Sequence, residues 1–291
     1  MSFVGWRNHY RWLLVLGLAV SFVFWPPILR SQTDCEKGTG RLRPEPPQRL
    51  SRAEIIQKFT AKESLLKTAR KNYTFTQDVS IQTLQPGMLP GDLRVDGEYR
   101  QVMEVSFDLK GKRLEHITFA PQSTLRWISL SVEDLDDFRE RMAFFLGSED
   151  LPKYSLLYAG QQRVDELETY VFDVAPKVFE PGQHYFQGRL WVESTDLVVV
   201  KLCGKTVPDV VPTKKKRRAE ENIHPKFVTY REPIDGENWF PTYTRSDDVL
   251  NFSNGNTVHI REIIKYTDYK RPGLKQGVVA RETLSSEKPA R

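Results

Sequence analysis

Apolar and polar residues alternate through most of the chain after residue 72, a pattern typical of β-strands with one buried face. In the first such segment Tyr73, Phe75 and Val79 share a face. Lys110-Gly111 joins two of the segments and predicts a β-hairpin. Twelve candidate segments are expected to give about ten or eleven strands; they lie at 72–84, 93–108, 112–119, 125–130, 154–164, 166–176, 184–193, 196–202, 225–232, 239–246, 249–252 and 257–269.

Two other segments have apolar residues at helical spacing. The first begins at Ser51, which forms a capping box with Glu54, and runs to about residue 71. The second begins at Ser131 and runs to about residue 145. Each predicts an amphipathic helix that packs on a sheet. The apolar residues are Ile55, Ile56, Phe59, Leu65, Leu66 and Ala69 in the first helix, and Leu135, Phe138, Met142 and Phe145 in the second.

Strands that follow one another without helices between them favour antiparallel pairing over a βαβ fold. We therefore expect a mainly β domain at 51–270: an open, highly curved antiparallel sheet, or incomplete β-barrel, closed by two or more helices. A Pro- and Arg-rich arm at 32–50 precedes this domain and a polar tail at 271–291 follows it. The helices are expected to fill part of the concave side of the sheet and to leave a pocket.

The first residues, 1–31, have the pattern of a secretory signal segment. Arg7 and Arg11 precede an apolar stretch at 13–25, which ends at Pro26 and Pro27. As a helix this stretch spans about 20 Å, and a hydrocarbon core is about 30 Å thick. The sequence therefore predicts export to the periplasm. Because 29–31 is an imperfect cleavage site, an uncleaved N-terminal anchor is the alternative.

The chain has two cysteines, Cys35 and Cys203. In an oxidising compartment they can form a disulfide that ties the arm to the domain, or they can remain separate thiols. Cys35 follows Thr33-Asp34, and these residues do not make the small-residue motif of a lipoprotein. Lipidation of Cys35 is therefore not expected.

Catalytic and metal-binding motifs are absent: the sequence has no G-x-S-x-G, H-E-x-x-H, P-loop or C-x-x-C. His116, His184, His224 and His259 stand alone on different strands or loops, and Asp134, Asp136 and Asp137 have the place of solvated acids in a first helical turn. We expect no enzyme activity, no cofactor and no metal.

The net charge is +5, and five of the positive charges belong to Lys214, Lys215, Lys216, Arg217 and Arg218. This run predicts either contact with an anionic membrane surface or a solvated loop. The rest of the exported chain is slightly acidic, so nucleic acid is not expected as a partner.

Aromatic residues are the more informative class, because many of them fall in the expected strands. A concave sheet with large apolar side chains and no polar catalytic cluster suits an acyl chain better than a polar substrate. The residues that we expect to line such a cavity are Tyr73, Phe75, Phe107, Trp127, Phe138, Met142, Trp191 and Phe240.

Three segments resemble the outer-membrane lipoprotein-sorting proteins, the LolA/LolB-like superfamily of periplasmic carriers. They are Asn72-Tyr73-Thr74-Phe75-Thr76-Gln77, Trp239-Phe240-Pro241-Thr242-Tyr243-Thr244 and the final expected strand at 258–269. Two more, at 119–125 and 230–236, look like an acidobacterial-type branch of the superfamily. The resemblance covers about residues 50–270.

This resemblance implies an incomplete barrel whose apolar cavity shields lipid or lipoprotein acyl chains, without catalysis. It also implies a strand arginine that helps to hold a lid closed, for which Arg94 and Arg100 are candidates by their position in an early strand. The basic loop at 204–223 departs from the family pattern. A periplasmic carrier is thus the first hypothesis; an envelope structural or adaptor protein with a filled core, and a hydrolase with a spatially assembled site, are the alternatives.

Overall fold

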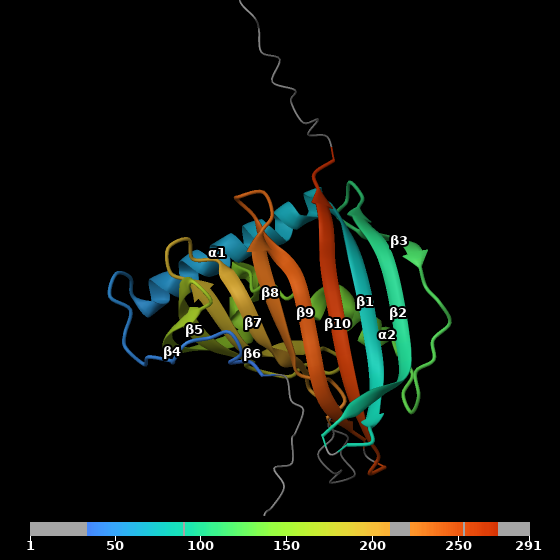
Figure 1. Ribbon diagram of the computed structural model, residues 1–291. Helices are drawn as coiled ribbons and strands as arrows, with labels where there is room; N and C mark the ends of the chain where they lie inside the picture. The colour runs from blue at the N-terminus through green and yellow to red at the C-terminus, as the bar shows by residue number, and fades with distance from the viewer. Residues whose placement is uncertain (1–33, 90, 210–221, 253, 273–291) are drawn as a thin grey trace, which may run out of the picture. The chain divides into compact units, whose positions relative to one another are not determined.

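The computed structural model describes residues 34–89, 91–209, 222–252 and 254–272 (Figure 1). The expected signal segment, the basic run at 214–218 and most of the expected tail lie outside these residues. The described residues form ten strands: β1 (Thr74–Pro86), β2 (Leu93–Phe107), β3 (Arg113–Phe119), β4 (Tyr154–Val164), β5 (Leu167–Pro176), β6 (Tyr185–Glu193), β7 (Val199–Val207), β8 (Phe227–Pro233), β9 (Trp239–Asn251) and β10 (Thr257–Lys270).

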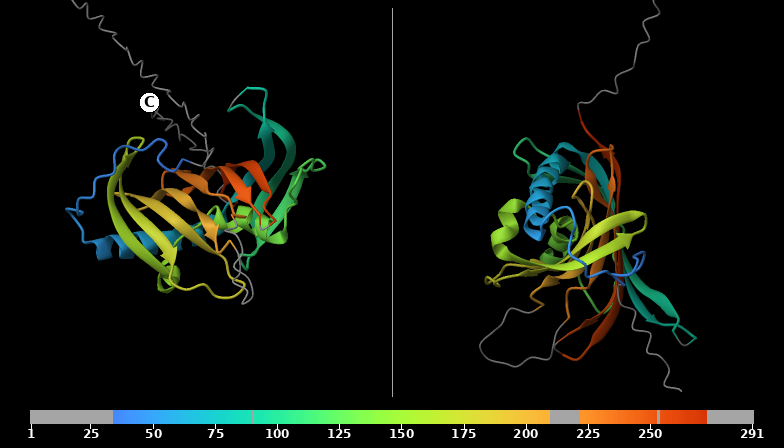
Figure 2. Two further views of the ribbon diagram at one scale, coloured as in Figure 1. Left: turned by 90° about the horizontal axis from the view of Figure 1, so that it is seen from below. Right: turned by 90° about the vertical axis from the view of Figure 1, so that its left-hand side faces the viewer.

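All ten strands belong to one sheet in the order β3-β2-β1-β10-β9-β8-β7-β6-β5-β4. Every neighbouring pair is antiparallel. β3 and β4 stand at opposite ends of the order, so the sheet stays open, and Figures 1 and 2 show that it curves strongly between them. The predicted open, curved antiparallel sheet is confirmed.

Helix α1 (Arg52–Ala69) begins where the capping box predicts. The Ser51 side chain accepts a hydrogen bond from the backbone N–H of Glu54, and the Glu54 carboxylate accepts one from the backbone N–H of Ser51. Ile55 and Phe59 are fully buried against the sheet. A short 3₁₀ turn, η1 (Arg70–Asn72), leads from the helix into β1.

The connection between β3 and β4 joins the two ends of the sheet order, so it crosses the concave side (Figure 2, right). It contains α2 (Val132–Asp136), a π-helical turn η2 (Asp137–Arg141) and a 3₁₀ turn η3 (Ser148–Lys153). The helix expected at 131–145 therefore ends early. Its apolar residues still pack inward: Phe138, Met142 and Leu146 are buried in the core.

The prediction of a strand at 125–130 is wrong, because this segment pairs with no strand of the described sheet. Trp127 has a positive φ of 70°, which breaks an extended run. Leu125, Ile128 and Leu130 pack on the core from an irregular segment instead. The strands expected at 239–246 and 249–252 are one continuous strand, β9.

Both faces of the sheet are buried over much of β5 to β8. The concave face packs on α1 and the β3–β4 connection, in a cluster that includes Phe59, Phe138 and Phe172. A second cluster includes Trp191 on the convex face, and Cys35 and Leu42 of the arm pack against this cluster. The arm therefore acts as a cover for the convex face.

Candidate functional site

The middle of the concave side is filled with side chains. Phe75, Phe138 and Met142, which the sequence predicts to line a cavity, are all buried in the core cluster on this side. Two hydrogen bonds hold the η2 backbone to the sheet. The Gln77 side chain donates to the carbonyl of Phe138 within η2 (2.9 Å), and the Thr229 hydroxyl donates to the carbonyl of Met142, which follows η2 (2.7 Å). Space for a ligand lies to either side of this packed centre.

A buried ion pair joins α1 to the sheet. Arg231 of β8 donates to both carboxylate oxygens of Glu63 at 2.8 and 3.1 Å, and their side chains are 0% and 1% exposed. Arg231 also donates to the carbonyl of Phe144 and lies over the ring of Phe145. One guanidinium thus fixes both the helix and the β3–β4 connection to the concave face.

The lid-holding role expected for Arg94 or Arg100 stays a prediction, and neither of these residues contacts α1 in the way that Arg231 does. Arg100 pairs instead with Asp78 on the neighbouring strand β1, and Arg94 is exposed on β2. The signal that was missed is Glu63, an acid on the same helical face as Ile55 and Phe59. A buried acid on an apolar helical face is costly unless it is paired or hydrogen-bonded, so Glu63 pointed to a partner on the sheet.

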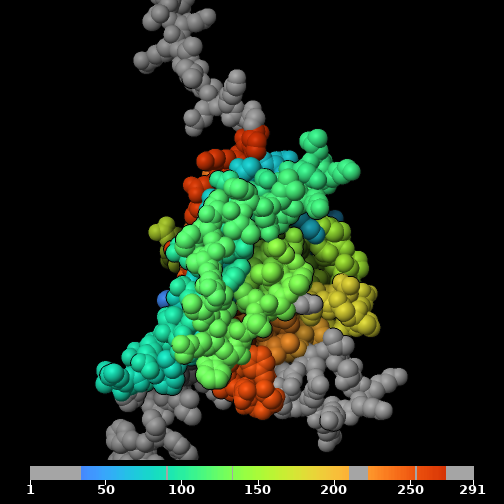
Figure 3. Space-filling view, turned by 90° about the vertical axis from the view of Figure 1, so that its right-hand side faces the viewer, coloured from blue at the N-terminus to red at the C-terminus, as the bar shows by residue number. Residues whose placement is uncertain are grey.

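A cavity of about 560 Å³ lies at one side of the packed centre. Figure 3 shows its surroundings: the green segment that follows β3 lies beside the orange-red ends of β9 and β10. Leu250, Phe252 and Ile260 close one side, and Ile128 packs against them. The residues that line the cavity are Ile81, Trp127, Ile128, Ser129, Leu130, Ser131, Asp134, Phe138, His184, Ile223, His224, Pro225, Leu250, Phe252, Ile260 and Glu262.

The lining of this cavity is mostly apolar, and its volume is in the range of small-molecule sites, about 300–1,000 Å³. Trp127 stands at the rim with its side chain held by Asp96, and it is 82% exposed. Phe138 forms part of the floor, where the cavity meets the packed centre. Of the eight predicted lining residues, these two contact this cavity.

The titratable groups of the cavity are acids and histidines. Glu262 of β10 is 5% exposed, and its Oε2 has no hydrogen-bond partner among the described residues. Burial raises the pKa of Glu262 to about 8, and the charges of Asp134 and Asp248 act in the same direction. His224 contacts Asp137 at 3.3 Å, and burial lowers the pKa of its imidazole. Its ring lies against that of His184, with centroids 5.3 Å apart.

A smaller cavity of about 380 Å³ lies on the other side of the packed centre. Phe107 lines it together with Arg70 and Arg113, and both of these guanidinium groups lie near the ring of Phe75. Lys67 at its edge is paired with Glu149 and Asp150. Its mixed charges and smaller size make it the less suitable site for an apolar ligand.

The remaining predicted lining residues contact neither cavity. Tyr73 and Phe240 pack edge to face with centroids 5.0 Å apart, and both rings also pack on Tyr269. Trp191 lies in the cluster under the arm and donates to Gln162 at 2.7 Å. A period of two places these residues on one face of each strand, but it does not say which face is concave.

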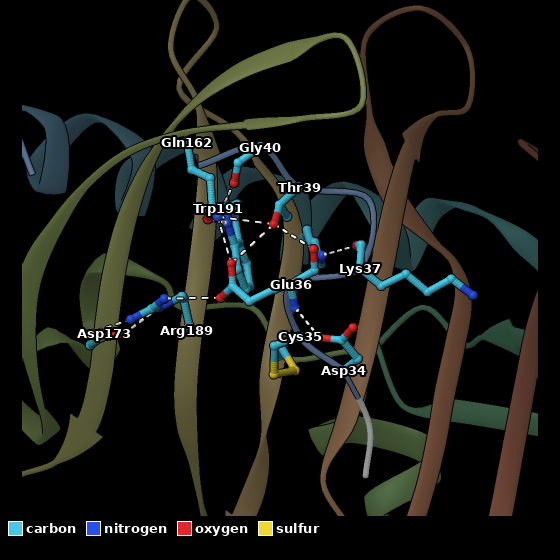
Figure 4. Close-up of polar contacts among 12 residues, drawn as sticks. Asp34, Cys35, Glu36, Lys37, Thr39, Gly40, Gln162, Asp173, Arg189 and Trp191 are labelled. Atoms are coloured by element: carbon cyan, nitrogen blue, oxygen red, sulfur yellow. Dashed lines mark hydrogen bonds and ion pairs between the residues drawn. A yellow bond between two sulfur atoms is a disulfide. The ribbon is translucent and has the colours of Figure 1, made fainter. Parts of the chain in front are cut away.

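The arm is fixed to the convex face by a disulfide between Cys35 and Cys203 of β7 (Figure 4). Gln162 donates to Glu36, Thr39 and Gly40 of the arm. Arg189 pairs with Asp173 and reaches Glu36 at 3.3 Å. The arm also forms backbone hydrogen bonds with β4 at Gly40 and Arg43, so it continues the sheet beyond that strand.

No protein-family model matches the chain, and no curated protein matches it by sequence. Among solved structures, the chain is similar to a DUF1329 family protein from Desulfovibrio piger, with 16% identity, 75% of this chain and 95% of that chain covered, and a TM-score of 0.34. It is similar to a LolA superfamily protein from Nitrosomonas europaea, with 15% identity, 74% and 95% covered, and a TM-score of 0.31. It is also similar to MucB in the MucA/MucB complex of Pseudomonas aeruginosa, with 11% identity, 71% and 93% covered, and a TM-score of 0.21.

A LolA superfamily protein is thus among the similar structures, and this is the superfamily that the sequence resembles. At these values the likeness is one of fold alone. In the part of the chain that the structure describes, no helix is both long and apolar enough to cross a membrane. The same residues contain no group of three or more His, Cys, Asp or Glu side chains placed to hold a metal ion.

Proposed function

We propose that this chain is a non-catalytic carrier that reversibly binds an apolar chain, such as the acyl chain of a lipid or lipoprotein. The observation that carries the proposal is the apolar cavity of about 560 Å³ between the β3–β4 connection and the ends of β1, β9 and β10. Each buried methylene contributes about 0.8 kcal/mol. A short acyl chain therefore gains enough free energy to bind at micromolar concentration.

The proposed compartment is the periplasm. The Cys35–Cys203 disulfide agrees with folding in an oxidising compartment. The basic run at 214–218 would bring the carrier to an anionic membrane surface, where an acyl chain is taken up or released.

Uptake of a fluorescent fatty acyl probe by the full chain tests the proposal. Leu130→Trp and Ile223→Trp place a large ring in the cavity and are expected to weaken binding at least about tenfold. Val178→Trp adds the same ring at an exposed position outside the cavity and is expected to leave binding unchanged. Equal binding by all three variants would refute the assignment of this cavity.

The packed centre favours a second function, that of an envelope adaptor protein. Phe138 and Met142 fill the concave side where a longer cavity would otherwise run. Native mass spectrometry of the protein purified from its own envelope distinguishes the two functions. A carrier is expected to retain an extractable lipid, whereas an adaptor is expected to give a clean apo mass or a protein complex.

A further inference from the structure

The cavity places a buried carboxyl group against an apolar wall. Glu262 projects from β10, where it is paired across the sheet with Ile81 of β1 and Ser246 of β9. The Ser246 hydroxyl donates to the carbonyl of Lys226 instead. Oε2 of Glu262 is buried without a hydrogen-bond partner among the described residues. An unpartnered carboxyl oxygen at this depth is costly unless a ligand supplies a donor.

The charged side chains that line the cavity in the described part of the chain do not neutralise Glu262. Asp134 on α2 lines the same cavity, and Asp248 on β9 lies close enough to act on the Glu262 charge. Asp248 accepts hydrogen bonds from the backbone N–H groups of Lys226 and Val249. The two histidines that line the cavity are His184 and His224, and burial favours the neutral form of His224.

None of the described residues that line the cavity is a lysine or an arginine. Within the described lining, a carboxylate or phosphate head group would therefore meet Asp134 and Glu262 without a basic side chain to pair with. A cationic head group would supply both the missing donor and the missing charge, and charge-assisted hydrogen bonds are the stronger ones.

We infer that the ligand is an amphiphile whose apolar chain occupies the cavity and whose primary ammonium group binds the Glu262 carboxylate, with Asp134 adding to the attraction. This inference rests on the proposed function, because it requires that the cavity binds an apolar chain.

A further consequence is a proton exchange. The raised pKa means that Glu262 is mostly protonated in the free protein at pH 7. An alkylammonium ion has a pKa near that of lysine, about 10.4, and stays charged. Binding therefore ionises Glu262 and releases nearly one proton to the solvent. Affinity for the amine is expected to rise from pH 6 to pH 8 and then to level off.

Calorimetry with dodecylammonium, dodecanol and dodecanoate below their micelle concentrations tests the inference on the full chain with its disulfide intact. Dodecylammonium is expected to bind at least about tenfold more tightly than the other two probes at pH 7. The heat of its binding, measured in buffers of different ionisation enthalpy, is expected to report the release of nearly one proton.

Glu262→Gln is expected to reduce amine binding to the level of dodecanol and to abolish proton release, with dodecanol binding unchanged. Glu104→Gln, at an exposed position on β2, is the matched control and is expected to behave like the wild type. Equal binding of the amine and the alcohol, or proton release that persists in Glu262→Gln, would overturn the inference and leave the carrier proposal standing. Binding of none of the three probes would overturn both. The comparison of probes on the wild type does not depend on any variant.

Discussion

Replacing Glu262 by glutamine is expected to remove a large pH dependence of stability. The pKa of Glu262 is raised from 4.5 to about 8 in the folded chain. Below pH 4.5 the group is protonated in both the folded and unfolded states. Between pH 4.5 and 8 the unfolded chain loses this proton and the folded chain keeps it, so the free energy of unfolding falls as pH rises.

The size of the effect follows from the shift. Each pH unit in this window costs about 1.4 kcal/mol, which amounts to about 3 kcal/mol at pH 7 and about 5 kcal/mol above pH 8. Glutamine does not titrate, so Glu262→Gln loses this slope. Burying the glutamine amide changes the free energy of unfolding by the same amount at every pH, so it does not affect the slope against pH.

Urea denaturation at pH 5, 6, 7 and 8 measures the effect as a difference between variant and wild type. This difference cancels the titration of groups that do not interact with Glu262. The stability of Glu262→Gln relative to wild type is expected to rise by about 3 to 4 kcal/mol from pH 5 to pH 8. Glu104→Gln, at an exposed position, is expected to give a flat difference. A flat difference for Glu262→Gln as well would refute the assignment of a buried, protonated carboxyl group.

Three further perturbations test the contacts that hold the fold together, each by chemical denaturation against the wild type. Glu63→Gln leaves Arg231 buried without a counter-charge and is expected to cost about 3–5 kcal/mol; a loss below about 1 kcal/mol would mean that water reaches the pair. Replacing Cys35 and Cys203 together by serine opens a loop of 168 residues and is expected to cost up to about 5 kcal/mol, and no loss under oxidising conditions would show that the arm does not depend on the bond. Phe59→Ala leaves a cavity under α1 and is expected to cost about 3–5 kcal/mol; a much smaller loss would contradict the close packing of this helix.

The strands and the first helix could be predicted because local patterns specify them. The alternation around Phe75 and Val79 and the capping box at Ser51 depend on neighbouring residues alone. The apolar residues around Trp127 wrongly predicted a strand, because a strand also needs a partner at its edge.

The site residues were harder to predict because their roles depend on partners far away in the chain. Trp191 and Phe240 are aromatic strand residues, but Trp191 lies on the face that the arm covers, and Phe240 packs on Tyr73 and Tyr269 instead of lining the cavity. Arg231 finds Glu63 at a separation of 168 residues, and Glu262 meets the β3–β4 connection only in the folded sheet. The hydrophobic periodicity of a sequence does not indicate which distant residues come into contact.

The position of the arm has a consequence for self-association. An unpaired outer strand is a template for aggregation, because its free N–H and C=O groups can pair with another chain. The arm blocks β4 in this way, so β3 is the one outer strand without a neighbour beyond it in the described sheet, and it carries the exposed residues Leu114, Ile117 and Phe119. Reduction of the disulfide would release the start of the arm and open a second template at β4. A reducing environment is therefore expected to turn a chain that can add strands at β3 alone into one that can add strands at both β3 and β4.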